Sequence, residues 1–149
     1  MVRDNRISKG LKTARIIQIA YLVAILIYAD LMFHLLLGEG ISPVLSIGDS
    51  RITILTVVLS VLAACSIVTG YFWPQLVKGD KSRMGLLSVY VVRAALLGSV
   101  AGFGLILGLV GAVWGIPLIF FLVSAVALIL TFPTREKWKK MMEYVGLDF

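Results

Sequence analysis

The sequence contains only one cysteine and one histidine, and this scarcity excludes two kinds of site. Cys65 has no second cysteine to pair with, so no intrachain disulfide can form, and its apolar surroundings predict a small, packed hydrophobic residue. One histidine and one cysteine cannot build a self-contained multi-ligand metal site or a bis-histidine haem site. We therefore expect no metal ion and no other cofactor.

Recognisable catalytic motifs are lacking too. The chain has no Walker-type phosphate loop and no glycine-rich dinucleotide fingerprint after a strand. Ser60, Ser66 and Ser88 have no visible general base. A stand-alone enzyme is therefore not expected, and no catalytic or cofactor-binding residue is assigned. A membrane-bound enzyme would need a substrate cavity that these residues do not suggest.

Charge is also scarce, because 15% of the 149 residues are charged and 60% are hydrophobic. Soluble domains carry about 25% charged and about 45–50% apolar residues. The excess lies in long, nearly charge-free blocks, each close to the ~20 residues that a helix needs to cross a ~30 Å hydrocarbon layer. A soluble core of this size could not enclose so many all-round apolar helices. The composition therefore predicts a multi-pass integral membrane protein.

The blocks predict a single all-α membrane domain over residues 1–149, with four transmembrane helices arranged as two hairpins. Ile16 to Leu37 is too long for a signal-peptide core and lacks a convincing cleavage site, so it is interpreted as a retained first helix. Pro74 is expected to end the second span and Pro133 the fourth. Residues 1–15 are basic, with apolar residues at helical spacing, and are interpreted as a short helix on the headgroups. The expected spans are about 16–37, 52–73, 85–109 and 115–132.

The tail, 134–145, has the pattern of an amphipathic helix that lies on the membrane surface. Thr134 can cap it, and apolar residues recur at spacings of three, four and seven opposite basic ones. The alternative is a disordered, solvated tail, because a helix of about 12 residues is marginal without a surface to bind. The residues assigned to the membrane surface are Trp138, Lys139, Lys140, Met141 and Met142.

Basic residues predict the orientation. The arm at 1–15 holds five Lys/Arg, the turn at 75–84 three and the tail four, whereas the two opposite loops hold Arg51 alone. Twelve against one is a strong positive-inside bias, so both termini are expected to be cytoplasmic. Because these residues flank apolar spans, the net charge of +6 indicates contact with the lipid bilayer and not with nucleic acid.

Apart from tyrosines and Cys65, three ionisable side chains fall inside the expected spans: Asp30, His34 and Arg93. A charge at such depth costs about 2.5–3.5 kcal/mol or more, so each should face protein or water. Asp30 and His34 share one helix face, and the axial gap from Asp30 to Arg93 is about 9 Å. Two interpretations stay open. Either Asp30 and Arg93 pair with each other, or with another subunit, and fix the packing, or all three residues form a proton or ion relay.

The third span is rich in small residues at four-residue spacing, which lets membrane helices approach closely. This pattern predicts a helix at the centre of the bundle or against a partner subunit. The two small-residue faces hold Ala94, Gly98 and Gly102, and Gly104, Gly108 and Ala112.

The stretch RAALLGSVAGFGLILGL, residues 93–109, resembles the second helix of the rotary ATPase proteolipid (c-type) subunits. That helix reads as a small-residue run, a leucine and a carboxylate, then an apolar-aromatic-glycine-leucine step. The two-hairpin topology also resembles the duplicated, four-helix members. The resemblance implies that the ion-carrying carboxylate falls at Gly98, and the family's glycine-rich first helix is absent. A proteolipid of this sequence could not carry protons in the family's manner.

These features predict a small integral-membrane accessory subunit that packs against other membrane subunits, or against copies of itself in a proteolipid-like oligomer. The alternative is a small ion, proton or solute transport protein that uses Asp30 and Arg93.

The predicted topology can be tested by cysteine labelling in a variant without Cys65. Cysteines at positions 78 and 139 should react with a membrane-impermeant thiol reagent only after the cytoplasmic face is opened, because the basic segments lie inside. A cysteine at position 49 should react from outside. Labelling at position 78 in sealed, right-side-out cells would overturn the assignment.

Overall fold

A computed structural model of the chain describes residues 2–38, 50–76, 86–110 and 115–145, with side chains for 9–34, 50–76, 86–110 and 115–140. Within these ranges the regular structure is entirely helical. The helices are α1 (Val2–Gly38), α2 (Ser50–Leu76), α3 (Leu86–Leu109), α4 (Gly115–Leu130) and α5 (Arg135–Val145). The predicted all-α class is therefore confirmed over the described residues.

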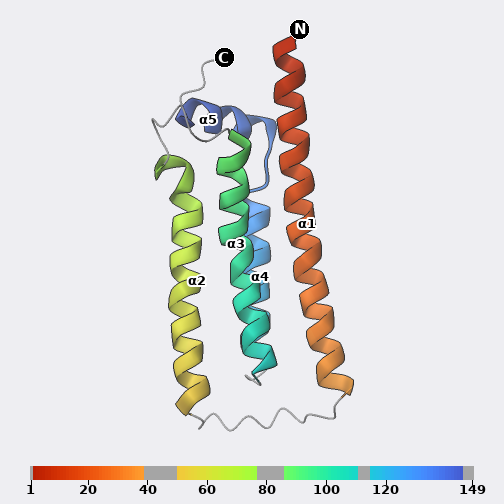
Figure 1. Cartoon of the computed structure of the whole chain (residues 1–149), viewed down its shortest axis with the longest axis vertical. Helices are drawn as coiled ribbons and strands as arrows, with labels where there is room; N and C mark the ends of the chain where they lie inside the picture. Colours follow the sequence, from red (N-terminus) through yellow and green to blue (C-terminus); the bar gives the residue numbers. More distant parts are fainter. Residues whose placement is uncertain (1, 39–49, 77–85, 111–114, 146–149) are drawn as a thin grey trace.

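Helices α1 to α4 run side by side along the long axis, and α5 crosses the end of the bundle at which α1 begins (Figure 1). Three of the helices, α1, α2 and α3, are long and apolar enough to cross a membrane. Helix α4 is apolar but has only 16 residues, which is about 24 Å of rise. Because α4 is short, it ends at Leu130, and α5 lies across the same end of the bundle.

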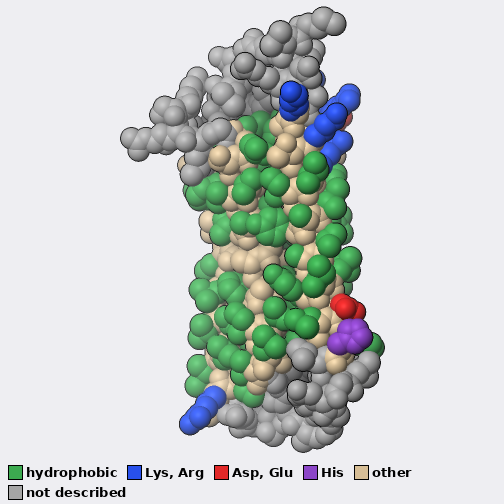
Figure 2. Space-filling model, turned by 45° about the vertical axis from the view of Figure 1, so that its right-hand side comes forward, with side chains coloured by type: hydrophobic (Ala, Val, Ile, Leu, Met, Phe, Trp, Pro, Cys, Tyr) green, Lys and Arg blue, Asp and Glu red, His purple; other side chains and the backbone are tan. Residues whose placement is uncertain are grey.

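Helix α3 lies at the centre and packs against α1, α2 and α4. Its sequence explains the position, because apolar and small residues occupy every side of it and many are buried. The other long helices instead present large apolar side chains outward, in the manner of lipid-facing helices. Figure 2 shows this apolar surface along the bundle, with Lys and Arg gathered near the end at which α1 begins.

Helices α3 and α4 approach each other closely at Gly104. A Cβ atom added there would lie 2.8 Å from Cβ of Phe120 and 3.0 Å from the carbonyl oxygen of Pro117. Only glycine lets the two backbones come this near. Glycine at this position therefore sets the distance between α3 and α4.

The other small residues of α3 have different neighbours. Ala94 is buried in the main core cluster, Gly98 faces the ring of Tyr21 on α1, and Gly108 faces the end of Met32. A Cβ atom at Gly102 would have no atom within 4 Å, because Gly102 lines a cavity between α3 and α1 that Tyr21 and Tyr28 also line. The spacing identified a small-residue face but not how much of it a neighbouring helix covers.

Three helix boundaries differ from the prediction. Residues 2–15 continue α1 as one helix of 37 residues instead of lying separately on the headgroups, because their apolar spacing runs unbroken into the first span. Helix α2 passes Pro74 and ends at Leu76, since a proline near a helix end disturbs little of the hydrogen bonding. Helix α4 ends at Leu130, because Pro133 disfavours helical geometry at Phe132.

Two alanine substitutions on α3 test this packing. Gly104→Ala should lower the free energy of unfolding by about 2 kcal/mol, because backbone and Cβ atoms of α4 cannot move aside without separating the helices. Gly102→Ala is the matched control and should leave stability unchanged or slightly raised, since alanine favours helix. Denaturant titration in mixed micelles measures both. Equal losses would mean that α4 does not approach α3 at Gly104.

Candidate functional site

The candidate site is built around the end of α4, whose last carbonyl groups have no donors from further helix. Pro133 follows closely and supplies no backbone N–H. Locally, the Thr131 hydroxyl donates to the carbonyl of Ala127 at 2.8 Å, and the Phe132 amide donates to that of Ile129 at 3.1 Å. The remaining carbonyls need donors from elsewhere in the chain.

Those donors come from three other helices. On α1, Gln18 Nε2 donates to the carbonyl of Leu128, and Arg15 Nε donates to that of Pro133 at 3.2 Å. Tyr90 Oη on α3 donates to the carbonyl of Thr131 at 3.3 Å, and Lys137 Nζ on α5 donates to that of Leu130 at 2.6 Å. The bonds from Gln18 and Tyr90 are buried, where a lost partner is costly, whereas the bond from Arg15 is half-buried and that from Lys137 is exposed. The end of α4 therefore holds α1, α3 and α5 together.

Helix α5 begins immediately after this junction. The Thr134 hydroxyl accepts from the Lys137 amide at 3.3 Å, which is the predicted N-cap, and the Trp138 amide donates to the Thr134 carbonyl at 2.9 Å. The indole of Trp138 is only 4% exposed and packs against Gly10 of α1 and the ring of Tyr90, at 6.1 Å between centroids. The tail is thus helical from Arg135 and docked on the bundle.

This docking corrects the assignment of Trp138 to the membrane surface, because the indole points into the protein core. The missing side chain of Gly10 leaves room for the indole on α1, a fit that the tail's periodicity alone does not reveal. Lys139 and Lys140 are exposed. Met141 and Met142 belong to α5, but their side chains lie outside the described part of the structure.

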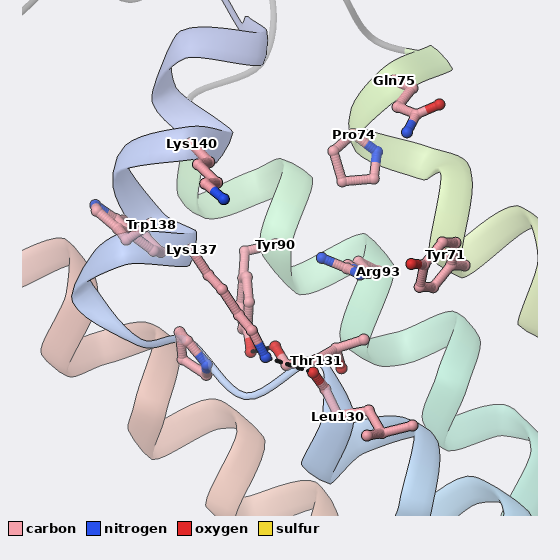
Figure 3. Close-up of a pocket in the computed structure, with 11 residues that line it drawn as sticks. Tyr71, Pro74, Gln75, Tyr90, Arg93, Leu130, Thr131, Lys137, Trp138 and Lys140 are labelled. Carbon is pink, nitrogen blue, oxygen red and sulfur yellow. Dashed lines mark hydrogen bonds between the residues drawn. The ribbon is translucent and has the colours of Figure 1, made fainter.

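A cavity of about 260 Å³ lies beside the junction (Figure 3). Helix α2 forms one side, α3 the floor, the end of α4 another side and α5 the cover. Three of its lining side chains are basic, and none of the described lining residues is acidic. The lining consists of Tyr71, Pro74, Gln75, Tyr90, Arg93, Leu130, Thr131, Pro133, Lys137, Trp138 and Lys140.

Arg93 is the least satisfied member of the lining. Its Nε atom is buried and has no hydrogen-bond partner among the described residues. Its guanidinium carbon lies 5.9 Å from the centre of the Tyr71 ring, a cation–π contact that offsets only part of the cost of burial. The sequence identifies Arg93 as an intramembrane charge but does not reveal the cavity. The sequence does carry a pattern for the lining, because Tyr90 and Arg93 share one face of α3, and Lys137 and Lys140 share one face of α5.

Asp30 and His34 lie elsewhere, on the outer surface of α1. The carboxylate Oδ1 is 3.7 Å from His34 Nε2, and the two side chains are 72% and 74% exposed. Buried Ile25 marks the face of α1 that packs on the bundle. Asp30 lies five residues further on, which is about 140° around the helix. The pair therefore points away from the other helices.

The predicted contact between Asp30 and Arg93 is wrong within this chain. Both residues have the expected positions along their helices, but Asp30 faces outward on α1 whereas Arg93 faces the cavity among α2, α3 and α5. The rise per residue gives the position of each side chain along the helix axis, but it does not give the direction in which the side chain points. For the same reason Asp30, His34 and Arg93 do not form a continuous relay among the described residues.

Comparison of the chain with protein-family models, with curated proteins and with solved structures found no match. The resemblance of residues 93–109 to proteolipid subunits therefore stays a prediction. In the structure this stretch forms α3 from Arg93 to its end at Leu109, and Gly98 faces a tyrosine ring.

The two glutamines of the chain allow a matched test of the α4 junction. Gln18→Met should lower the free energy of unfolding by roughly 1 kcal/mol, because it removes the buried hydrogen bond between α1 and α4 and leaves the carbonyl of Leu128 with the Thr131 hydroxyl alone. Gln75→Met changes an exposed glutamine and should have little effect. Thermal unfolding in detergent measures both variants. A Gln18 variant as stable as the wild type would mean that this hydrogen bond does not hold α1 to α4.

Proposed function

We propose that the protein is a small accessory subunit of a membrane complex, with four spans and both termini in the cytoplasm. In this proposal it holds a transmembrane helix of a different chain against the outer face of α1. The observation that carries the proposal is the Asp30–His34 pair, which is exposed on a helix that is otherwise apolar at that depth.

The arrangement of the helices supports four spans. Because α1 to α3 are each long enough to cross and lie side by side, α4 must return the chain to the end at which α1 begins, where α5 lies. Its 16 residues cover about 24 Å of the ~30 Å layer. The capped segment from Thr131 to Thr134 and the docked α5 then occupy the remaining depth and the interface.

The distribution of charge supports the orientation. Lys9, Lys12 and Arg15 lie near the start of α1, at the end of the bundle that also carries the basic residues of α5. Arg51 lies at the start of α2, at the opposite end. Basic residues concentrate on the cytoplasmic side of membrane proteins, so the end with α5 is assigned to the cytoplasm.

The cost of an exposed charge supports a partner. Asp30 lies about 12 Å before Gly38 along α1, inside the outer leaflet, with exposed Ile27 and Leu31 beside it. A carboxylate facing hydrocarbon costs about 2.5–3.5 kcal/mol or more, although its contact with His34 recovers part of this. A basic or hydrogen-bonding side chain on a neighbouring helix would remove the cost. The partner is therefore a transmembrane helix that carries such a side chain at the depth of Asp30.

A different chain fits this face better than a second copy does. Two copies related by a two-fold axis along the membrane normal would bring like carboxylates together, which is unfavourable. The transport alternative requires Asp30 and Arg93 in one passage, whereas they lie on separate surfaces of the described chain. The contacts therefore favour assembly over transport.

The test is co-purification after gentle solubilisation. The wild type should retain a second membrane protein in fixed stoichiometry, and Asp30→Leu should lose at least tenfold of it, because the polar contact is removed. The isolated Asp30→Leu chain should be as stable as the wild type or more so, since Asp30 is 72% exposed and its ion pair is with His34 on the same helix. Ser60→Leu, an exposed change on α2, is the control and should retain the partner.

Three results would contradict the proposal. The first is a wild-type protein that purifies alone, and the second is one that purifies only with copies of itself. The third is ion flux into vesicles that disappears with Asp30→Leu while assembly is unchanged, which would support the transport alternative.

A further inference from the structure

We propose that the cavity beneath α5 binds the phosphate headgroup of an anionic phospholipid from the cytoplasmic leaflet. The inference goes beyond the assembly role, because the cavity lies at the opposite end of the bundle from Asp30 and shares no residue with that face.

The charge of the lining points to an anion. Arg93, Lys137 and Lys140 converge on one space, and none of the described lining residues carries a negative charge. Figure 3 shows Arg93 entering from α3 and Lys140 from α5. Three cations at the edge of a low-dielectric region repel one another and are poorly solvated, so an anion bound among them is favoured.

The hydrogen-bonding groups suit phosphate. Arg93 lines the cavity, and its guanidinium is a planar donor fork that can bind two phosphate oxygens at once. Lys137 donates one N–H to the carbonyl of Leu130, and an ammonium group has two more. Lys140 is exposed and carries no other assigned contact in the described structure. Arg93 on α3 and the two lysines on α5 therefore line one cavity from two helices.

The rim of the cavity favours a lipid over a soluble phosphate compound. Two of its lining residues, Leu130 and Tyr71, are 67% and 60% exposed on the apolar outer surface. An acyl chain can lie against that surface while the headgroup enters beneath α5. The volume of about 260 Å³ is below the ~300–1,000 Å³ of typical small-molecule pockets, and so it suits one headgroup and not a whole lipid. Basic pockets on the cytoplasmic side of membrane helices are known binding places for such headgroups.

The experiment measures thermal unfolding of the delipidated full chain in mild detergent. One arm adds phosphatidylglycerol, a second adds zwitterionic phosphatidylcholine, and a third adds inorganic phosphate alone. Phosphatidylglycerol should raise the melting temperature in a saturable way, and the other two additions should do so far less. Native mass spectrometry should count one retained phosphatidylglycerol per chain.

Matched variants locate the effect. Lys140→Gln should weaken the apparent affinity for phosphatidylglycerol about tenfold, because it removes one charge-assisted hydrogen bond. Lys139→Gln removes the same charge from the neighbouring residue, which does not line the cavity, and should change the affinity less than twofold. Arg93→Gln should have the largest effect, and Lys140→Gln keeps the test decisive if the Arg93 variant does not fold.

The proposal is overturned if phosphatidylglycerol gives no saturable stabilisation, or if Lys139→Gln and Lys140→Gln weaken binding equally, which indicates diffuse surface attraction. It is also overturned if inorganic phosphate alone reproduces the full stabilisation, which indicates a soluble ligand.

Discussion

The backbone of a helix that ends inside or at the edge of a membrane must find hydrogen-bond donors, and the end of α4 is where this constraint acts on the chain. Helix α4 stops at Leu130, and Pro133 removes one of the few local N–H groups. Side chains from α1, α3 and α5 supply the missing donors, Gln18 and Tyr90 among them. The fold-back of α5, the burial of Trp138 and the cavity beside it are consequences of covering this short helix.

The position of α3 follows from a second constraint, which is the absence of a hydrophobic driving force between helices in lipid. Close packing replaces it, and Gly104 allows α3 and α4 to approach at backbone distance. Gly102 instead lines a cavity between α3 and α1, so small residues at regular spacing do not all serve this purpose. A helix packed on several sides fixes the directions of its polar residues, and this is why Arg93 faces one cavity and not the lipid.

The sequence alone predicted the features that depend on length and composition: the all-helical class, four apolar helices and an amphipathic tail helix. It did not predict Trp138 in the core, because burial there depends on Gly10, more than 120 residues away in the chain. The pairing of Asp30 with Arg93 failed for a related reason. Hydrophobic blocks give the height of a residue along a span, but the direction of its side chain depends on which helices are neighbours. The cavity needed four separate segments in place, and no local pattern encodes that.

The central claim is that α5 is a capped helix that begins directly at the end of α4. Amide hydrogen exchange at Lys137 and Trp138, measured on the full chain in nanodiscs, tests it most directly, because both amides are bonded to Thr134 in the docked structure. The account predicts exchange slowed at least a hundredfold relative to an unstructured peptide. Exchange of both amides at the unstructured rate would show that the tail is solvated and undocked, and would contradict the account.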